Sequence, residues 1–132
     1  MPAISRDDIK TRGLSRFRKS FIYSIEGLKY AFKYEQSLTI HILATVVVIA
    51  TNILLKVTFA EWATTLLTIG VVLAMELINT AIEAVVDLVT LEIHPLAKIA
   101  KDCGSAATFV MAVVAIIIAL LVYGPYIVNL LS

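Results

Sequence analysis

Three long apolar blocks are the feature of this sequence that most limits its possible folds. Residues 38–55 and 105–132 contain no charged side chain, and residues 62–75 are also uncharged before acidic residues begin at Glu76. A hydrocarbon layer of about 30 Å requires about 20 helical residues to cross it. We therefore predict an all-α integral membrane protein with transmembrane helices at 38–55, 62–90 and 105–129.

The composition excludes several other classes of protein. Hydrophobic residues make up 60% of the chain and charged residues 16%, against about 45–50% and about 25% in soluble domains. The net charge of +1 provides no basic excess for a nucleic-acid partner. The single cysteine excludes an intramolecular disulfide. A length of 132 residues predicts one domain covering residues 1–132.

The lysines and arginines are unevenly distributed, which predicts the orientation in the membrane. Cytoplasmic segments carry the excess of these residues. Eight of the eleven precede the first apolar block, namely Arg6, Lys10, Arg12, Arg16, Arg18, Lys19, Lys29 and Lys33. Lys98 and Lys101 follow the second block, whereas only Lys56 lies between the first two. We expect the N-terminus and residues 88–104 in the cytoplasm, and the C-terminus outside.

The segment 14–34 has the pattern of an amphipathic helix. Phe17, Phe21, Ile25, Leu28 and Phe32 recur at helical spacing, while most of the basic residues lie off this stripe. A basic amphipathic helix next to a transmembrane helix is typical of a segment that lies in the membrane interface. We predict an interfacial helix here.

The second block contains a polar stripe at the end that we expect to face the cytoplasm. Glu76, Asn79, Glu83 and Asp87 are spaced by three, four and four residues, so they share one face of a helix. Counting about 1.5 Å per residue from Trp62, Glu76 lies about 21 Å along the helix and Glu83 about 32 Å. A carboxylate at membrane depth costs about 3 kcal/mol on insertion scales, so such residues usually mark a functional site.

Other charged residues are expected near this stripe. Glu35 precedes the first apolar block, and Lys101 and Asp102 precede the third. Carboxylates suit Mg²⁺, which binds one or two of them together with substrate phosphates. Carboxylates for a metal, a cation for phosphates and a buried carboxylate beside lipid are the components of a phosphoryl-transfer site. The chain has no Walker A or GxGxxG motif that would identify the phosphate donor.

Two other functions are compatible with the same residues. Acidic residues inside a membrane also line ion or proton pathways, although residues 62–75 lack the polar groups that a continuous path needs. A structural subunit could use the polar stripe only to join helices. An ion flux without ATP would indicate the first function, and loss of assembly without any enzymatic activity would indicate the second.

Three motifs resemble those of the bacterial small integral-membrane lipid kinases, the family of prokaryotic diacylglycerol kinase and undecaprenol kinase. The run E-x-x-N-x-x-x-E-x-V-x-D matches at Glu76, Asn79, Glu83, Val85 and Asp87. The run H-x-x-x-x-x-A-K-D-x-x-x-A matches at His94, Ala100, Lys101, Asp102 and Ala106. The element G-x-x-x-A-x-x-x-E matches at Gly27, Ala31 and Glu35. The resemblance extends from about Arg16 to about Leu120.

The resemblance implies a fold, a reaction and a role for each matching residue. It implies a homotrimer with shared active sites in the bacterial inner membrane, which uses ATP to phosphorylate a lipid hydroxyl. Glu76 would be the general base and Asn79 would orient the catalytic groups. Glu35 and Glu83 would hold Mg²⁺, and Lys101 would contact the ATP phosphates. Asp87 and Asp102 would lie in the nucleotide region, and Arg16 and Ser24 match weaker nucleotide or substrate positions.

The lipid acceptor predicted from the resemblance is undecaprenol, with diacylglycerol as the alternative. Pro95 after His94, and His41 in the first apolar block, are similar to the undecaprenol kinase branch, whereas Ser37 and the run GSAA at 104–107 are not typical of it. We expect His41 to make an interhelical hydrogen bond. His94 is expected either to contact the nucleotide or to cap the next helix, and Cys103 to pack against a neighbouring helix.

Overall fold

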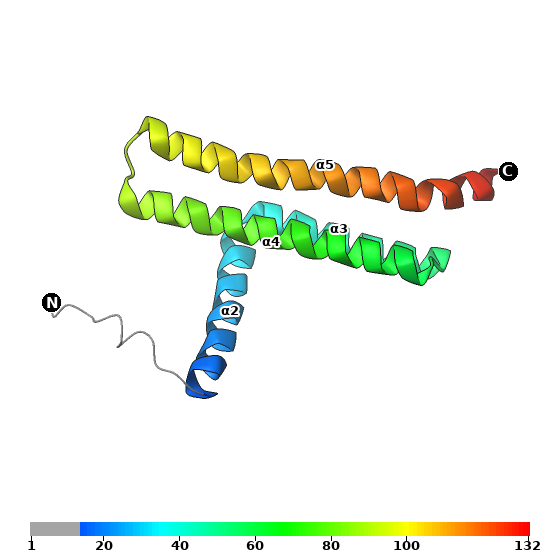
Figure 1. The fold of residues 1–132 in the computed structure, drawn as a ribbon, viewed down its shortest axis with the longest axis horizontal. Helices are drawn as coiled ribbons and strands as arrows, with labels where there is room; N and C mark the ends of the chain where they lie inside the picture. Colours follow the sequence, from blue (N-terminus) through cyan, green and yellow to red (C-terminus); the bar gives the residue numbers. More distant parts are fainter. Residues whose placement is uncertain (1–13) are drawn as a thin grey trace. The chain divides into compact units, whose positions relative to one another are not determined.

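The computed structural model describes residues 14–132, and all the regular structure in that range is helical (Figure 1). The four helices are α2 (Leu14–Tyr34), α3 (Gln36–Leu55), α4 (Phe59–Val89) and α5 (Pro95–Leu131). The predicted all-α fold is thus confirmed. The last three helices are each long and apolar enough to cross a membrane. The predicted topogenic residues Arg6, Lys10 and Arg12 lie outside the described residues.

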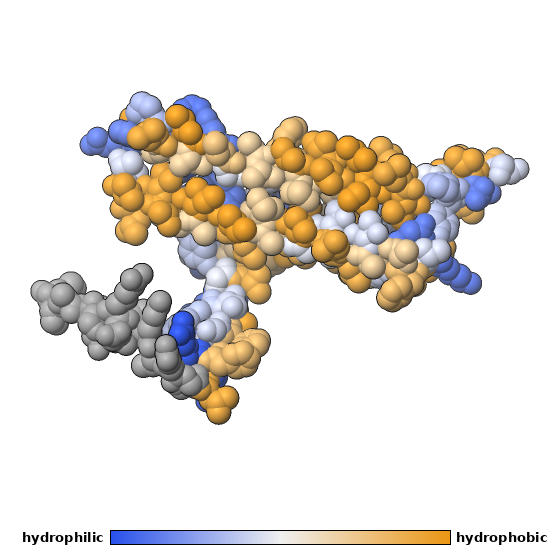
Figure 2. All heavy atoms as spheres, viewed as in Figure 1, coloured by the Kyte–Doolittle hydropathy of each residue, from blue (hydrophilic) through white to orange (hydrophobic). Residues whose placement is uncertain are grey.

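The surface of the long helices reflects this composition. Figure 2 shows apolar residues over the middle of α4 and α5, with polar residues gathered toward the ends of the helices. Such a distribution is typical of helices whose middle faces hydrocarbon and whose ends reach the headgroups. Most of the large apolar side chains on these helices are exposed.

Helix α2 has the bounds predicted from the sequence. Its apolar stripe contains one close aromatic pair, because the rings of Phe17 and Phe21 lie 5.0 Å apart in an edge-to-face arrangement. The Lys33 ammonium lies 5.0 Å from the centre of the Tyr34 ring, a cation–π contact. The helix carries basic residues and exposed aromatic residues together, as an interfacial helix requires.

The predicted transmembrane segments correspond to longer helices in the structure. Helix α3 begins two residues before the predicted residue 38. Helix α4 begins at Phe59 rather than at residue 62, because Thr58 and Glu61 form a capping box that satisfies the first free N–H groups. Helix α5 begins at Pro95, ten residues before the predicted residue 105, because His94 caps it and proline suits the first helical position.

Helix α5 contains Pro125 in its interior. It continues to Leu131, two residues beyond the predicted end of the transmembrane helix at residue 129. Proline removes one backbone donor but leaves its own carbonyl free to accept. In transmembrane helices such an interruption is tolerated when neighbouring groups compensate for the lost bond.

A buried polar cluster joins the three long helices at one end. We call this the tyrosine end, and it consists of Asn52, Thr65 and Tyr123. The fully buried Asn52 donates from Nδ2 to Thr65 Oγ1 at 2.8 Å, and the Tyr123 hydroxyl donates to Asn52 Oδ1 at 2.6 Å. These two bonds connect α3 to α4 and to α5. Interhelical polar contacts of this kind stabilise and align helices in lipid.

Two contacts fix the antiparallel register of α3 against α4. Asn52 faces Thr65 at the tyrosine end, and His41 faces Glu76 eleven residues further along both helices. Extending this register by six residues places Glu35, the N-cap of α3, level with residues 82 and 83 of α4. This register supports the predicted proximity of Glu35 to the acidic stripe, which stays a prediction.

Candidate active site

The acidic stripe of α4 begins with a carboxylate that is almost completely buried. Glu76 is only 5% exposed, although it carries an ionisable group. It lies on the face of α4 that is turned toward α3, and its carboxylate Oε2 lies 3.8 Å from Nε2 of His41. His41 therefore faces Glu76 across the helix interface, but the predicted interhelical hydrogen bond is not formed, because 3.8 Å is longer than a direct hydrogen bond.

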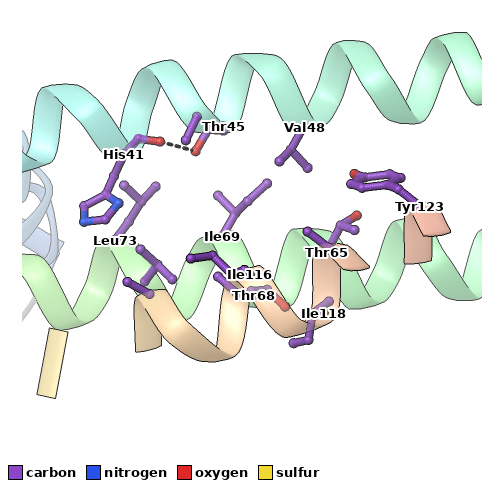
Figure 3. Close-up of a pocket in the computed structure, with 15 residues that line it drawn as sticks. His41, Thr45, Val48, Thr65, Thr68, Ile69, Leu73, Ile116, Ile118 and Tyr123 are labelled. Atoms are coloured by element: carbon purple, nitrogen blue, oxygen red, sulfur yellow. Dashed lines mark hydrogen bonds between the residues drawn. The ribbon is translucent and has the colours of Figure 1, made fainter. Parts of the chain in front are cut away.

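An apolar cleft between α3, α4 and α5 extends from His41 toward the tyrosine end (Figure 3). Its volume is about 260 Å³. Figure 3 shows His41 at one end and Tyr123 at the other, with the aliphatic side chains of Val48, Ile69 and Leu73 between them. Thr45 does not present a free hydroxyl to this space, because its Oγ1 donates to the His41 carbonyl at 2.8 Å.

Asn79 and Glu83 form the next part of the stripe. The Asn79 Nδ2 group donates to Glu83 Oε1 at 3.0 Å, so the amide holds the carboxylate from the preceding turn of α4. Asn79 Oδ1 is buried and accepts no hydrogen bond from any of the described residues. A buried unpaired acceptor is costly, which makes such a group typical of functional sites. The predicted orienting role of Asn79 has a physical basis in its contact with Glu83.

Gly104 of α5 provides the space that Asn79 occupies. A Cβ built on Gly104 would overlap Asn79 Oδ1 and lie 3.7 Å from the Ile82 Cδ1 atom. Gly104 is buried in this contact. The absence of a side chain at Gly104 therefore allows α5 to approach the amide that holds Glu83.

Gly104→Ala is expected to lower activity while the protein remains folded. The new methyl group displaces the Asn79 amide, and Glu83 then loses its positioning donor. Because a small misplacement of catalytic groups is costly, we expect a loss of about 100-fold in turnover. Gly124→Ala is the matched control on the same helix, because its Cβ would meet nothing within 4 Å. Steady-state kinetics and thermal unfolding in detergent measure both variants. Equal activity of the two would contradict the role of Gly104.

Two charged pairs lie where α4 ends and α5 begins. The Lys101 ammonium of α5 donates to Asp87 Oδ1 of α4 at 2.6 Å. Lys98 pairs with Asp102 within the first turns of α5. Both pairs are largely exposed, and both border a polar hollow of about 370 Å³. The structure thus brings together Lys101 and Asp87, and it places Asp102 beside Lys98 in the same hollow.

His94 borders this hollow but uses its side chain to begin a helix. Its Nδ1 atom accepts a hydrogen bond from the Leu96 N–H at 3.2 Å, which is the capping role that the sequence offered as one of two possibilities. Cys103 is an exposed free thiol in the single chain. The packing role predicted for Cys103 stays a prediction, since Cys103 borders a small hollow together with Ile78 of α4.

The remaining predicted residues lie on other elements. The side chain of Glu35 accepts no capping hydrogen bond at the start of α3. Arg16 and Ser24 lie on α2, where the Ser24 hydroxyl donates to the Ser20 carbonyl at 2.9 Å. Residues 14–132 contain no group of three His, Cys, Asp or Glu side chains placed to hold a metal ion by themselves.

The tyrosine end contains polar residues that the sequence patterns did not single out. Tyr126 donates to Glu61 Oε2 at 2.7 Å, and the same oxygen accepts from the Thr58 N–H, also at 2.7 Å. Asn52 could have predicted polar contacts at this end from the sequence. It is an amide inside an otherwise apolar block, and a buried amide requires hydrogen-bond partners.

Comparisons with known proteins agree with this arrangement. The family model of prokaryotic diacylglycerol kinase matches residues 22–123. The chain is 40% identical over 112 residues to "Undecaprenol kinase" of Bacillus subtilis (strain 168), covering 85% of this chain and 91% of that protein. It is 45% identical over 98 residues to "Diacylglycerol kinase" of Pseudomonas aeruginosa, covering 74% and 80%. The chain therefore belongs to the prokaryotic diacylglycerol kinase family and is a lipid kinase.

Proposed function

We propose that this protein transfers the terminal phosphate of ATP to the hydroxyl of undecaprenol. The observation that carries the proposal is the position of Glu76, a buried carboxylate near the inner end of an apolar cleft and on the same helix face as Glu83 and Asp87. A lipid alcohol reaches such a carboxylate from the bilayer. ATP reaches the charged pairs at the ends of α4 and α5 from water.

Glu76 acts in this proposal as the general base. As the lipid oxygen forms its bond to the terminal phosphorus, its proton passes to the Glu76 carboxylate, and the bond from that phosphorus to ADP breaks. A positioned base typically contributes 10²–10⁴-fold to the rate. The burial of Glu76 among the membrane-spanning helices supports this role, because it places the carboxylate where a lipid hydroxyl reaches it from the bilayer.

Glu35 and Glu83 are the residues that would hold Mg²⁺. The donor set fits, because Mg²⁺ binds through one or two carboxylates and completes its shell with waters and substrate phosphates. The register of the two adjacent helices supports the assignment, because it places Glu35 and Glu83 at about the same height. The Asn79 amide supports it as well, because its hydrogen bond orients Glu83. When bound, Mg²⁺ would neutralise part of the negative charge on the ATP phosphates. Asn79 keeps one Glu83 oxygen in place through its hydrogen bond.

Lys101 contacts the ATP phosphates in this proposal. Its ammonium lies at the mouth of the polar hollow, where its present partner is Asp87 on the adjacent helix. Asp87 and Asp102 form the acidic edge of the nucleotide region. Arg16 and Ser24 of α2 are the proposed additional nucleotide or substrate contacts.

We further propose a homotrimer with shared active sites. Within the single chain, only 11% of the apolar stretch of α3 is buried, 11% of that of α4 and 6% of that of α5. Three helices are too few to enclose sites for both a lipid and a nucleotide, so neighbouring subunits would complete them. The Lys and Arg distribution supports a bacterial inner-membrane protein whose N-terminus and active site face the cytoplasm and whose C-terminus lies outside.

Diacylglycerol is the second candidate acceptor. The protein from P. aeruginosa, which has the higher identity of the two relatives named above, is a "Diacylglycerol kinase". Undecaprenol is favoured because the match to "Undecaprenol kinase" covers more of both chains. The apolar cleft that extends from His41 toward the tyrosine end also supports an acceptor with one hydrocarbon chain.

A competition experiment distinguishes the two acceptors. The purified protein receives Mg·ATP and equal mole fractions of undecaprenol and diacylglycerol in mixed micelles, and the two lipid phosphates are separated and counted. We expect undecaprenyl phosphate to predominate by about 10-fold or more, a ratio that needs 1.4 kcal/mol of discrimination. Predominance of phosphatidic acid would overturn the assignment of the acceptor.

Two variants test whether the cleft sets this choice. Ala115→Phe fills the cleft, because Ala115 is one of its lining residues, whereas Ile117→Phe is the matched control at a half-exposed position outside the lining. We expect only Ala115→Phe to reduce the preference for undecaprenol. An equal ratio of products in both variants would contradict the contribution of the cleft.

A further inference from the structure

Among the described residues, His41 is the only basic side chain that pairs with the carboxylate of Glu76. Its Nε2 atom lies 3.8 Å from Glu76 Oε2. The cleft around it is lined from α4 by Leu73 and Val72 and from α5 by alanine and isoleucine residues, none of which carries an ionisable group. Tyr123 is ionisable but lies at the far end of the cleft and is engaged with Asn52. No other charged group in the described chain pairs with His41.

The two side chains differ in exposure, and this difference indicates the direction in which a proton would move between them. The Glu76 side chain is 6% exposed, and that of His41 is 23% exposed. Glu76 is buried within the chain, whereas His41 is less buried and lies six residues after Glu35, at the end of α3 that we expect to face the cytoplasm. The separation of 3.8 Å is longer than a direct hydrogen bond, and catalytic contacts of this kind often tighten in the loaded enzyme.

We propose that His41 is a positioning residue for Glu76 and the outlet for the proton that Glu76 receives. The inference rests on the proposed role of Glu76 as the base. After transfer, protonated Glu76 gives its proton to the unprotonated Nε2 of His41, which restores the carboxylate and forms an imidazolium. The imidazolium then loses one proton to water. Each turnover thus moves one proton from the lipid hydroxyl to solvent, and both side chains return to their starting charge.

This role separates the first turnover from later ones. Loss of the outlet leaves the first transfer intact, because Glu76 begins as a carboxylate. The second transfer must then wait for Glu76 to lose its proton by a slower route. A residue that only packs α3 against α4 would affect every turnover alike.

The decisive experiment is rapid-quench kinetics of His41→Gln with undecaprenol and Mg·ATP in micelles. Glutamine places a nitrogen donor near the position of Nε2 but does not accept a proton. We expect a burst of one lipid phosphate per active site at the wild-type rate, followed by a steady state about 100-fold slower than wild type. Added imidazole should accelerate only the slow phase. His41→Asn provides a second amide variant if the glutamine variant is not folded.

Thr51→Val is the matched control for this experiment. Thr51 lies on the same helix as His41 but outside the lining of the cleft, and its hydroxyl donates to the Val47 carbonyl of its own helix at 2.8 Å. We expect wild-type kinetics without a burst. A steady-state rate of His41→Gln equal to that of wild type, or an equal slowing of its first and later turnovers, would overturn the proposal. Wild-type protein that phosphorylates neither lipid alcohol would instead contradict the proposed function.

Discussion

Glu76→Gln is expected to reduce turnover by about 10³-fold, which lies within the range that a positioned general base contributes. Glutamine keeps the size of the side chain and its ability to hydrogen-bond, but it does not accept the proton of the lipid hydroxyl. The variant should remain folded, because replacing a buried carboxylate by a neutral amide removes a desolvation cost. Nucleotide affinity should change little, since Glu76 lies deeper along α4 than Glu83 and Asp87.

The measurement compares phosphate transfer to lipid with binding of a fluorescent ATP analogue by the same preparation. Glu61→Gln is the control on the same helix, because Glu61 lies at the opposite end of α4 and is bonded to Tyr126. We expect the control to keep near wild-type turnover. Substantial turnover by Glu76→Gln, or a loss of nucleotide binding equal to the loss of turnover, would exclude the base assignment.

Lys101→Ala is expected to have the second-largest effect. Removing a charged group that stabilises a transferring phosphoryl group typically costs 10²–10³-fold. We expect this loss in kcat/KM for ATP, with little change in the KM for the lipid. Asp87 would lose its partner, but its side chain is 50% exposed, so the stability of the protein should change little.

Lys98→Ala is the matched control for Lys101→Ala. Both lysines lie in the first turns of α5 and both pair with an aspartate, but Lys98 pairs with Asp102 on its own helix. A small decrease in activity is expected for Lys98→Ala. Lys101→Arg should retain part of the activity, because arginine keeps the charge in a different geometry. Equal effects of the two alanine variants would mean that only the overall charge of the hollow matters.

Much of the fold could be predicted from local sequence patterns. The uncharged blocks located α3, α4 and α5, and the apolar stripe located α2 at its observed bounds. The ends of the helices were less accurate, because hydropathy reports the length that lipid covers and not the length that is helical. The earlier start of α4 has a local signal in Thr58 and Glu61, and the earlier start of α5 has one in His94 and Pro95.

The contacts of the site depended on packing that no local pattern contains. The stripe spacing predicted that Glu76, Asn79 and Glu83 share a face, but not that Asn79 holds Glu83 beside Gly104. Lys101 pairs with Asp87 fourteen residues away, and Tyr123 with Asn52 seventy-one residues away. These partners follow from the register of the helices, which is set by interactions between residues far apart in the sequence.

The central claim is that a carboxylate buried among transmembrane helices serves ATP-dependent chemistry on a lipid alcohol. The most direct measurement is transfer of radiolabel from the terminal phosphate of ATP to undecaprenol by the purified, folded protein in micelles. We expect many labelled lipid phosphates per protein molecule, and none when ATP is omitted. Absence of labelled lipid with both undecaprenol and diacylglycerol, together with an ATP-independent ion flux in proteoliposomes, would contradict it.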